Sequence, residues 1–352
     1  MTPAPPFRVG VMQLTMEPLE EILEHAHVMD EAGFDTIWLA EAYPWWRKHS
    51  MEARSSTALS ALVARETSRL AVGWGIISPY TRHPIQIAME ARVTQEAAGP
   101  GRFYLGLGVS KIFMRHAGIA EGAKPVAAMK EAAAIVRGVL SGGALDVDGK
   151  VFSAHVPALT DDAETPRWDV PLYFAGTGPM MLKAAAQAAD GLLTASITTP
   201  AFVRYVREQV AAAGRDPDTL DLGCTIVASI SDDREAGREG AREIAGMYLA
   251  NKVQNIQAAA DTLLECAGLT QEEIVPVAEA MEHGGRLAAK AAVTDEILDK
   301  CKPIAGTPED CIAAIEEYRA VGCTHVMLEL WGAKRHEQIR LFAEKVLPQF
   351  RA

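Results

Sequence analysis

Paired cysteines are missing from this sequence of 352 residues. Its five cysteines are odd in number and form no C-x-x-C pair, which argues against a disulfide framework and against a cysteine-rich zinc site. The sequence also lacks the basic and apolar segments of a signal peptide, and no apolar run is long enough to span a membrane. We therefore expect a cytoplasmic protein without a membrane partner.

Positive charge is scarce as well. The chain has 34 Lys and Arg residues against 46 Asp and Glu residues, which gives a net charge of −12. This balance argues against nucleic acid as a general partner, although a local basic cluster could still bind an anionic ligand. Apolar residues make up 49% of the chain, which is typical of a globular protein with a substantial core.

Several catalytic motifs are absent too. There is no H-x-x-x-H pair, no carboxylate cluster at ligand spacing and no G-x-S-x-G elbow. We therefore expect no metal ion, and we expect an organic cofactor to carry the chemistry.

The residues that are present alternate between short apolar runs and amphipathic helical segments. Eight such runs are each followed by a helix, and this predicts parallel βα units that close into a (β/α)8 TIM barrel. The expected strands cover 7–14, 36–40, a stretch that begins at Leu70, 103–108, 171–175, 191–195, 222–230 and 324–330. A doubly wound sheet is the rival, but no dinucleotide fingerprint lies near the amino terminus. We expect a single barrel domain over 1–352, with a hairpin insertion at about 145–168 and a helical insertion at about 251–305.

The third expected strand has an unusual end. Gly73 and Gly75 interrupt it, and Ser78 and Pro79 stop it before a polar turn. Glycines within a strand indicate a bulge or the close approach of a ligand or another backbone. An ordinary strand–loop–helix connection would give a similar pattern, so both interpretations stay open.

In a barrel of this kind, ligands bind where the strands end. Glu41 follows the second strand and is succeeded by Trp45 and Trp46 beside basic residues, which could form a wall for a flat anionic ligand or could belong to the core. After the fourth strand come three basic or titratable residues. They are Lys111, Arg115 and His116. His116 could donate a proton, or it could simply be solvated.

The fifth strand is followed by Gly176, Thr177, Gly178 and a proline at a helix start. Backbone N–H groups at such a position can bind an anion, although G-x-G-P can also be just a tight turn. Ala195 and Ser196, at the end of the sixth strand, could complete this pocket.

Four ordered motifs carry a resemblance to a known family. They are G-F-D-T-I-W-L-A-E at 33–41, S-P-Y-T-R-H-P at 78–84, G-R-F-Y-L-G-L-G at 101–108, and A-G-T-G-P at 175–179 followed by A-D-G at 189–191. Together with G-T-P-E at 306–309, they resemble the bacterial luciferase-like superfamily. The 78–84 segment is most similar to its deazaflavin-dependent branch, typified by methylenetetrahydromethanopterin reductase. The resemblance implies a barrel, usually a homodimer, that binds coenzyme F420 or, alternatively, FMN at the strand ends.

The resemblance also implies roles for particular residues. A non-prolyl cis peptide would join Gly75 and Ile76 beneath the cofactor ring, with Ser78 beside the ring and Glu41 nearby. The cofactor phosphate would lie on the amides of 176–178, close to 195–196. Related sugar-phosphate dehydrogenases have a carboxylate where this chain has Lys111 and a histidine where it has Ala42. These departures argue against sugar-phosphate oxidation, and they suggest that Lys111 binds an anionic substrate or the acidic tail of the coenzyme.

We therefore expect a coenzyme F420-dependent oxidoreductase that passes a hydride between the deazaflavin C5 and an unidentified small organic substrate. The catalytic candidates are Glu41, Lys111 and His116, and the substrate-binding candidates are Trp45, Trp46, Lys111 and Arg115. Two alternatives remain: an FMN-dependent monooxygenase of the same superfamily that uses externally reduced flavin, and a non-catalytic flavin-binding protein.

Overall fold

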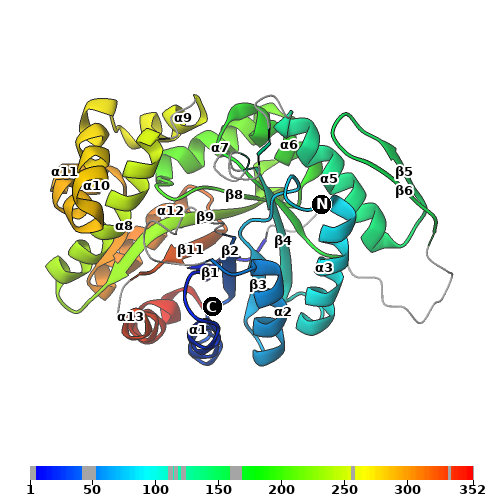
Figure 1. The fold of residues 1–352 in the computed structure, drawn as a ribbon. Helices are drawn as coiled ribbons and strands as arrows, with labels where there is room; N and C mark the ends of the chain where they lie inside the picture. The colour runs from blue at the N-terminus through cyan, green and yellow to red at the C-terminus, as the bar shows by residue number, and fades with distance from the viewer. Residues whose placement is uncertain are drawn as a thin grey trace.

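The computed structural model describes residues 5–41, 53–109, 114, 118–119, 124–158, 169–254, 258–331 and 334–351. Its centre is a barrel of eight parallel strands, in which pairing between β8 and β9 closes the ring (Figure 1). In ring order the strands are β1 (Arg8–Leu14), β2 (Thr36–Ala40), β3 (Ala71–Trp74), β4 (Phe103–Gly108), β7 (Leu172–Ala175), β8 (Gly191–Leu193), β9 (Asp221–Ile230) and β11 (His325–Glu329). The predicted (β/α)8 barrel is confirmed, and each of its strands overlaps one of the expected runs.

Helices surround this barrel and cover the outer face of its strands. They are α1 (Leu19–Ala32), α2 (Ser56–Glu66), α3 (Pro84–Ala98), α5 (Pro125–Ser141), α6 (Pro179–Ala188), α7 (Pro200–Ala212), α12 (Pro308–Ala320) and α13 (Arg335–Leu341). Proline opens α3, α5, α6, α7 and α12, since its fixed φ suits the first helical position and no N–H is needed there. Thr307 caps α12 in a capping box with Asp310, which holds the helix start close to the barrel.

The inside of the barrel is filled by large side chains. Trp38 lies at its centre, fully buried, and packs with other inward-facing side chains. They are Met12, Tyr173, Leu193 and Met327. A Cβ atom at Gly73 would lie 2.3 Å from the Trp38 ring. The glycine on β3 therefore makes room for the tryptophan on β2, its neighbour in the sheet.

The third strand has the irregular end that the glycines predicted. β3 stops at Trp74, a cis peptide bond joins Gly75 to Ile76, and pairing with β4 resumes at Ile77. The Ile77 amide donates to the Gly106 carbonyl at 2.9 Å, and the Gly108 amide donates to the Ile77 carbonyl at 3.0 Å. The structure thus confirms both the interruption and the cis bond at Gly75–Ile76.

Two insertions lie outside the barrel, on opposite sides in Figure 1. The hairpin of β5 (Leu145–Asp148) and β6 (Ser153–Val156) packs against α5. The second consists of α8 (Arg234–Gln254), α9 (Ala258–Ala267), α10 (Gln271–Ala292) and α11 (Asp295–Lys300). It therefore begins earlier in the chain than the helical insertion expected at about 251–305, because α8 packs along α10. It ends in β10 (Ile304–Gly306), a strand that the sequence did not predict and that pairs with the carboxyl end of β9.

No described helix is both long and apolar enough to cross a membrane. All five cysteines are free thiols.

Candidate functional site

The carboxyl ends of the barrel strands form a floor of small apolar groups. Ala40, Ile76 and Ala175 are partly exposed and pack on the buried cluster around Trp38. Gly108 ends β4 beside them, and a Cβ there would lie 2.7 Å from the Ile76 side chain. Because Ala40, Gly108 and Ala175 carry little or no side chain and Ile76 is apolar, a flat apolar ring system can lie against this end of the barrel.

Glu41 directly follows β2, at the edge of this floor. Arg82, from the loop after β3, forms an ion pair with one carboxylate oxygen, and the Ser56 hydroxyl donates to the other at 2.8 Å. Arg82 also lies 3.4 Å from the Glu90 carboxylate. The carboxylate is therefore oriented by two donors. The sequence predicted Glu41 as a site residue but not its partner Arg82.

Hydrogen bonds within the loop after β3 hold the loop in place. Ser78 is buried, and its hydroxyl accepts from the Tyr80 amide at 3.3 Å while its carbonyl accepts from the Thr81 hydroxyl at 3.0 Å. The His83 imidazole accepts from the Ile85 amide at the start of α3. These bonds fix the position of Ser78 relative to the cis peptide.

The ends of β7 and β8 lie next to each other, because the two strands pair. The Gly176 amide donates to the Leu193 carbonyl at 3.2 Å, so it is engaged in the sheet. Gly178 is the N-cap of α6, and no side chain caps this helix. The positive end of the α6 dipole is therefore open to an anion.

The loop after β8 contains Ala195 and Ser196. Ile197 has a φ of 70°, which is strained for a β-branched residue. The Thr198 hydroxyl donates to the Thr194 hydroxyl at 2.6 Å and holds the loop closed. The Ser196 hydroxyl donates at 2.8 Å to Glu329, the last residue of β11.

Glu329 is a site candidate that the sequence reasoning missed. It is fully buried, and Tyr248 of α8 donates to its second oxygen. Burial raises the pKa of Glu329 to about 7, against the opposing effect of the hydrogen bonds from Tyr248 and Ser196. Its signal in the sequence is a carboxylate inside the last expected strand (324–330), near its carboxyl end, whereas Glu41 follows its strand.

Five predicted residues lie outside the part of the chain that the structure describes. They are Trp45, Trp46, Lys111, Arg115 and His116.

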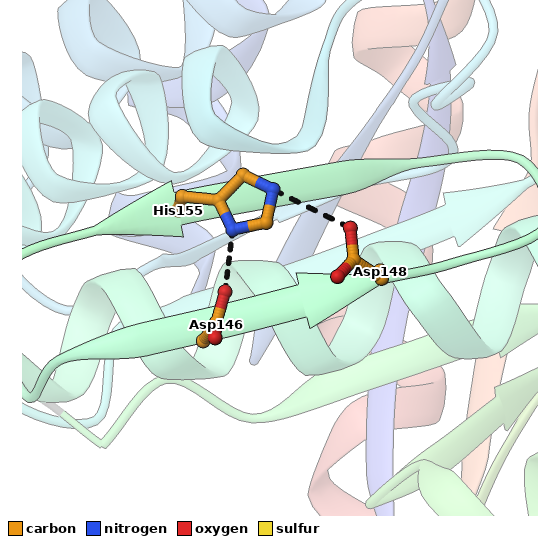
Figure 2. A group of neighbouring side chains, drawn as sticks. All are labelled: Asp146, Asp148 and His155. Carbon is orange, nitrogen blue, oxygen red and sulfur yellow. Dashed lines mark hydrogen bonds and ion pairs between the residues drawn. The ribbon is translucent and has the colours of Figure 1, made fainter.

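A separate polar cluster occupies the exposed hairpin (Figure 2). His155 lies opposite Asp146 in the β5–β6 pairing. Its Nδ1 atom contacts the Asp146 carboxylate, and its Nε2 atom contacts the Asp148 carboxylate. Each of these residues offers one atom that could bind a metal ion, and the three atoms lie within 4.8 Å of one another. In the described ranges, no other group of three His, Cys, Asp or Glu residues meets this condition. The hydrogen bond to Asp146 raises the pKa of His155. Since both ring nitrogens already face carboxylates, we interpret the group as an ion-paired strand surface.

The chain matches the family model described as luciferase-like monooxygenase over residues 4–325. Two curated relatives are similar over nearly their whole length. The 5,10-methylenetetrahydromethanopterin reductase of Methanolobus tindarius is 26% identical, with 96% of this chain and 99% of the relative covered. The F420-dependent glucose-6-phosphate dehydrogenase of Nocardia farcinica is 25% identical, with 94% of each covered.

A solved structure has the same fold. It is the coenzyme F420-dependent tetrahydromethanopterin reductase of Methanopyrus kandleri, with a TM-score of 0.83 at 24% identity, covering 98% of this chain and 100% of that one.

Proposed function

We propose that this chain, which belongs to the luciferase-like monooxygenase family, is a coenzyme F420-dependent oxidoreductase. It transfers a hydride between the deazaflavin C5 and a small organic substrate. The observation that carries the proposal is the full-length similarity to reductases and dehydrogenases of the deazaflavin branch. The irregular end of β3 and the strand-end floor described above support it.

The residues at the strand ends fit such a coenzyme. The floor of Ala40, Ile76, Gly108 and Ala175 suits a flat tricyclic ring. We propose that Glu41, Gly75, Ile76 and Ser78 contact the ring, and that the phosphate lies at the start of α6 beside Gly176, Thr177 and Gly178. Ala195 and Ser196 then lie nearby, with the Ser196 hydroxyl turned to Glu329. When bound, the coenzyme supplies the hydride, and the protein supplies position and electrostatic stabilisation.

The substrate side of the proposal comes from the sequence. We propose that Trp45, Trp46, Lys111 and Arg115 contact the substrate, with Glu41, Lys111 and His116 as catalytic candidates. The family resemblance implies a carboxylate at the position of Lys111 in sugar-phosphate dehydrogenases, so we do not transfer the glucose-6-phosphate substrate of the Nocardia relative to this chain. The single-domain organisation, with insertions at about 145–168 and 251–305, and the cytoplasmic location also stay proposals.

Titration of the purified chain with F420 and with FMN, followed by fluorescence, tests the cofactor. We expect saturable binding of F420, and reduced FMN should not support oxygen consumption. Tight binding of FMN alone would overturn the proposal and favour the monooxygenase alternative. Binding of F420 without turnover on a broad panel of unsaturated substrates would favour the non-catalytic alternative.

A variant at the start of α6 sharpens this test. Gly178→Asp places a carboxylate at the N-cap, where Asp favours the helix but occupies the position of the anion. We expect F420 to bind at least about tenfold more weakly, equivalent to about 1.4 kcal/mol, while the melting temperature stays unchanged. Met180→Gln, at a side chain of the same turn that is 74% exposed, is the control and should bind F420 normally.

We further propose that the chain forms a homodimer through α2 and α3. These adjacent helices expose Leu62 (45%), Met89 (57%) and Val93 (58%), and exposed large apolar side chains on neighbouring elements are typical of contact surfaces. Sedimentation analysis should show a dimer that Met89→Asp dissociates. The same change at Leu287, an exposed residue of α10, should leave it intact; a monomeric wild-type protein would contradict the proposal.

A further inference from the structure

Glu329 lies on the inner face of the barrel. Side chains alternate along β11, and Met327, two residues earlier, packs inside the barrel against the cluster around Trp38. Glu329 therefore points inward as well, one layer closer to the carboxyl ends of the strands. This is the level at which barrel enzymes bind their ligands.

Neutral side chains, rather than a cation, surround the carboxyl group of Glu329, with the Trp331 indole beside the two hydroxyls. Ser196 donates to one oxygen at 2.8 Å, and Tyr248 donates to the other. Arg335 of α13 acts on it only through its charge, because the Arg335 guanidinium bonds the Glu17 carboxylate at 2.6 Å and the Leu330 carbonyl at 2.8 Å. Among the described residues, no basic side chain forms an ion pair with Glu329.

A buried carboxylate without a paired cation carries a large desolvation cost, and taking up a proton removes it. The Tyr248 and Ser196 hydroxyls, the Trp331 indole and the charge of Arg335 partly offset that cost, because each favours the ionised form. These opposing effects bring the pKa of Glu329 to about 7, so both of its forms are accessible near neutral pH. That is the property required of a group that gives and takes protons during catalysis.

We propose that Glu329 is the proton donor and acceptor of the strand-end site and exchanges its proton with the substrate through Ser196. This inference rests on the proposed function, because reduction of an unsaturated substrate needs a proton in addition to the hydride. Ser196 is the suitable relay, since it bonds Glu329 from the loop that we propose borders the coenzyme. Tyr248 fixes the orientation of the carboxyl group from the insertion helix α8.

The proton balance is simple. In the reducing direction the O–H bond of Glu329 breaks and its proton bonds the Ser196 oxygen, while the original O–H bond of Ser196 breaks and that proton bonds the substrate heteroatom. The electron pair that reduces the substrate arrives with the hydride of the reduced deazaflavin. Glu329 is left ionised and regains a proton from solvent before the next turnover. In the oxidising direction the ionised Glu329 accepts the proton by the same route.

The first test needs no coenzyme. Infrared titration of the full chain should show a protonated carboxyl band that disappears as the pH rises through neutrality. Glu329→Gln should lack this band, and Ser196→Ala should retain it. A Glu329 that stays ionised below neutral pH, or stays protonated well above it, overturns the inference.

The second test is the pH profile of F420-dependent reduction. Wild-type kcat should fall above neutral pH, because Glu329 is then ionised and has no proton to donate. Glu329→Gln should lower kcat by about 10²–10⁴-fold without weakening F420 binding, and Glu329→Asp should restore part of it. Tyr248→Phe removes a bond that favours the ionised form, so the alkaline fall should move to higher pH. A structural role alone would not produce that movement.

The outcomes separate the two proposals. A wild-type chain that binds no F420 overturns the proposed function, whatever the infrared titration shows. Normal F420 binding, with the same kcat and the same pH profile in Glu329→Gln and wild type, overturns only the role of Glu329.

Discussion

Trp38 and Gly73 show how single residues shape the barrel interior. The Trp38 ring is fully buried and occupies the space that a side chain at Gly73 would need. Interiors are packed too densely for the ring to move aside without cost. We therefore expect Gly73→Ala to lower the free energy of unfolding by about 1–3 kcal/mol.

Urea denaturation followed by tryptophan fluorescence measures this change. Gly143→Ala is the matched control, because Gly143 is exposed and an added Cβ would meet only the Ser141 hydroxyl at 3.7 Å. The free energy of unfolding of Gly143→Ala should stay within about 0.5 kcal/mol of the wild-type value. If the two variants are equally stable, Trp38 does not constrain β3 as described.

Individual residues also show what could and could not be predicted about the site from the sequence. The glycines at 73 and 75 predicted the irregular strand, and the family motif located its cis bond correctly at Gly75–Ile76. Glu41 stood out because it follows a strand, but its bond to Arg82 joins residues 41 positions apart. Glu329 was missed because only the closed barrel shows which face of β11 points inward.

At the scale of elements, the β5–β6 hairpin depends on one side chain of α5. The Glu131 carboxylate accepts from the amides of Lys150, Val151 and Phe152 at 2.8–2.9 Å. Phe152 also contacts the Tyr80 and His83 rings of the loop after β3. Glu131 therefore links the first insertion to the barrel next to the strand ends.

Glu131→Ala should loosen this hairpin without unfolding the barrel. A net hydrogen bond is worth roughly 1 kcal/mol, so we expect these three amides to exchange with deuterium about tenfold faster or more. Lys130→Ala is the control, since Lys130 instead bonds Gln187 of α6. Unchanged exchange in Glu131→Ala would mean that the strand pairing alone holds the turn.

Elements with strong local signals were predicted, and short ones were not. Threonine and proline stand at the start of α12, where Thr307 is the cap and Pro308 the first helical residue. The hairpin expected within 145–168 is also present. β10 has only three residues, 304–306, and exists because it pairs with the end of β9; that contact between distant segments has no local signature.

At the scale of the whole molecule, the two ends of the barrel have different tasks. The carboxyl ends hold small side chains and the Glu41 and Glu329 networks. The amino ends hold a buried network around Asp221, which bonds Arg8 of β1, Tyr173 of β7 and Thr324 before β11. These residues join strands that are far apart in the sequence, so no local pattern predicted their contact. The network closes the barrel at the end away from the proposed site.

Removal of the charge of Asp221 tests this division. Asp221→Asn leaves Arg8 as a buried cation without a counterion, and we expect it to lower the free energy of unfolding by about 3–5 kcal/mol. Asp218→Asn is the control, because Asp218 is 68% exposed in its pair with Arg207 and should cost about 1 kcal/mol or less. Comparable losses in both variants would contradict a special role for the buried pair.

The pH dependence of this loss has a defined sign. Burial tends to raise the pKa of Asp221, but the charge of Arg8 and the bonds from Arg8 and Tyr173 outweigh it, so the pKa is lowered on folding. The stabilisation is therefore complete above the pKa of an unfolded Asp and is lost as the pH falls through the lower, folded value. The stability difference between wild type and Asp221→Asn should accordingly be constant near neutral pH and shrink in strong acid.

Because Asp221 lies at the amino end of the barrel, F420 binding by the folded variant should match that of wild type; a weakened affinity would show that the two ends are coupled.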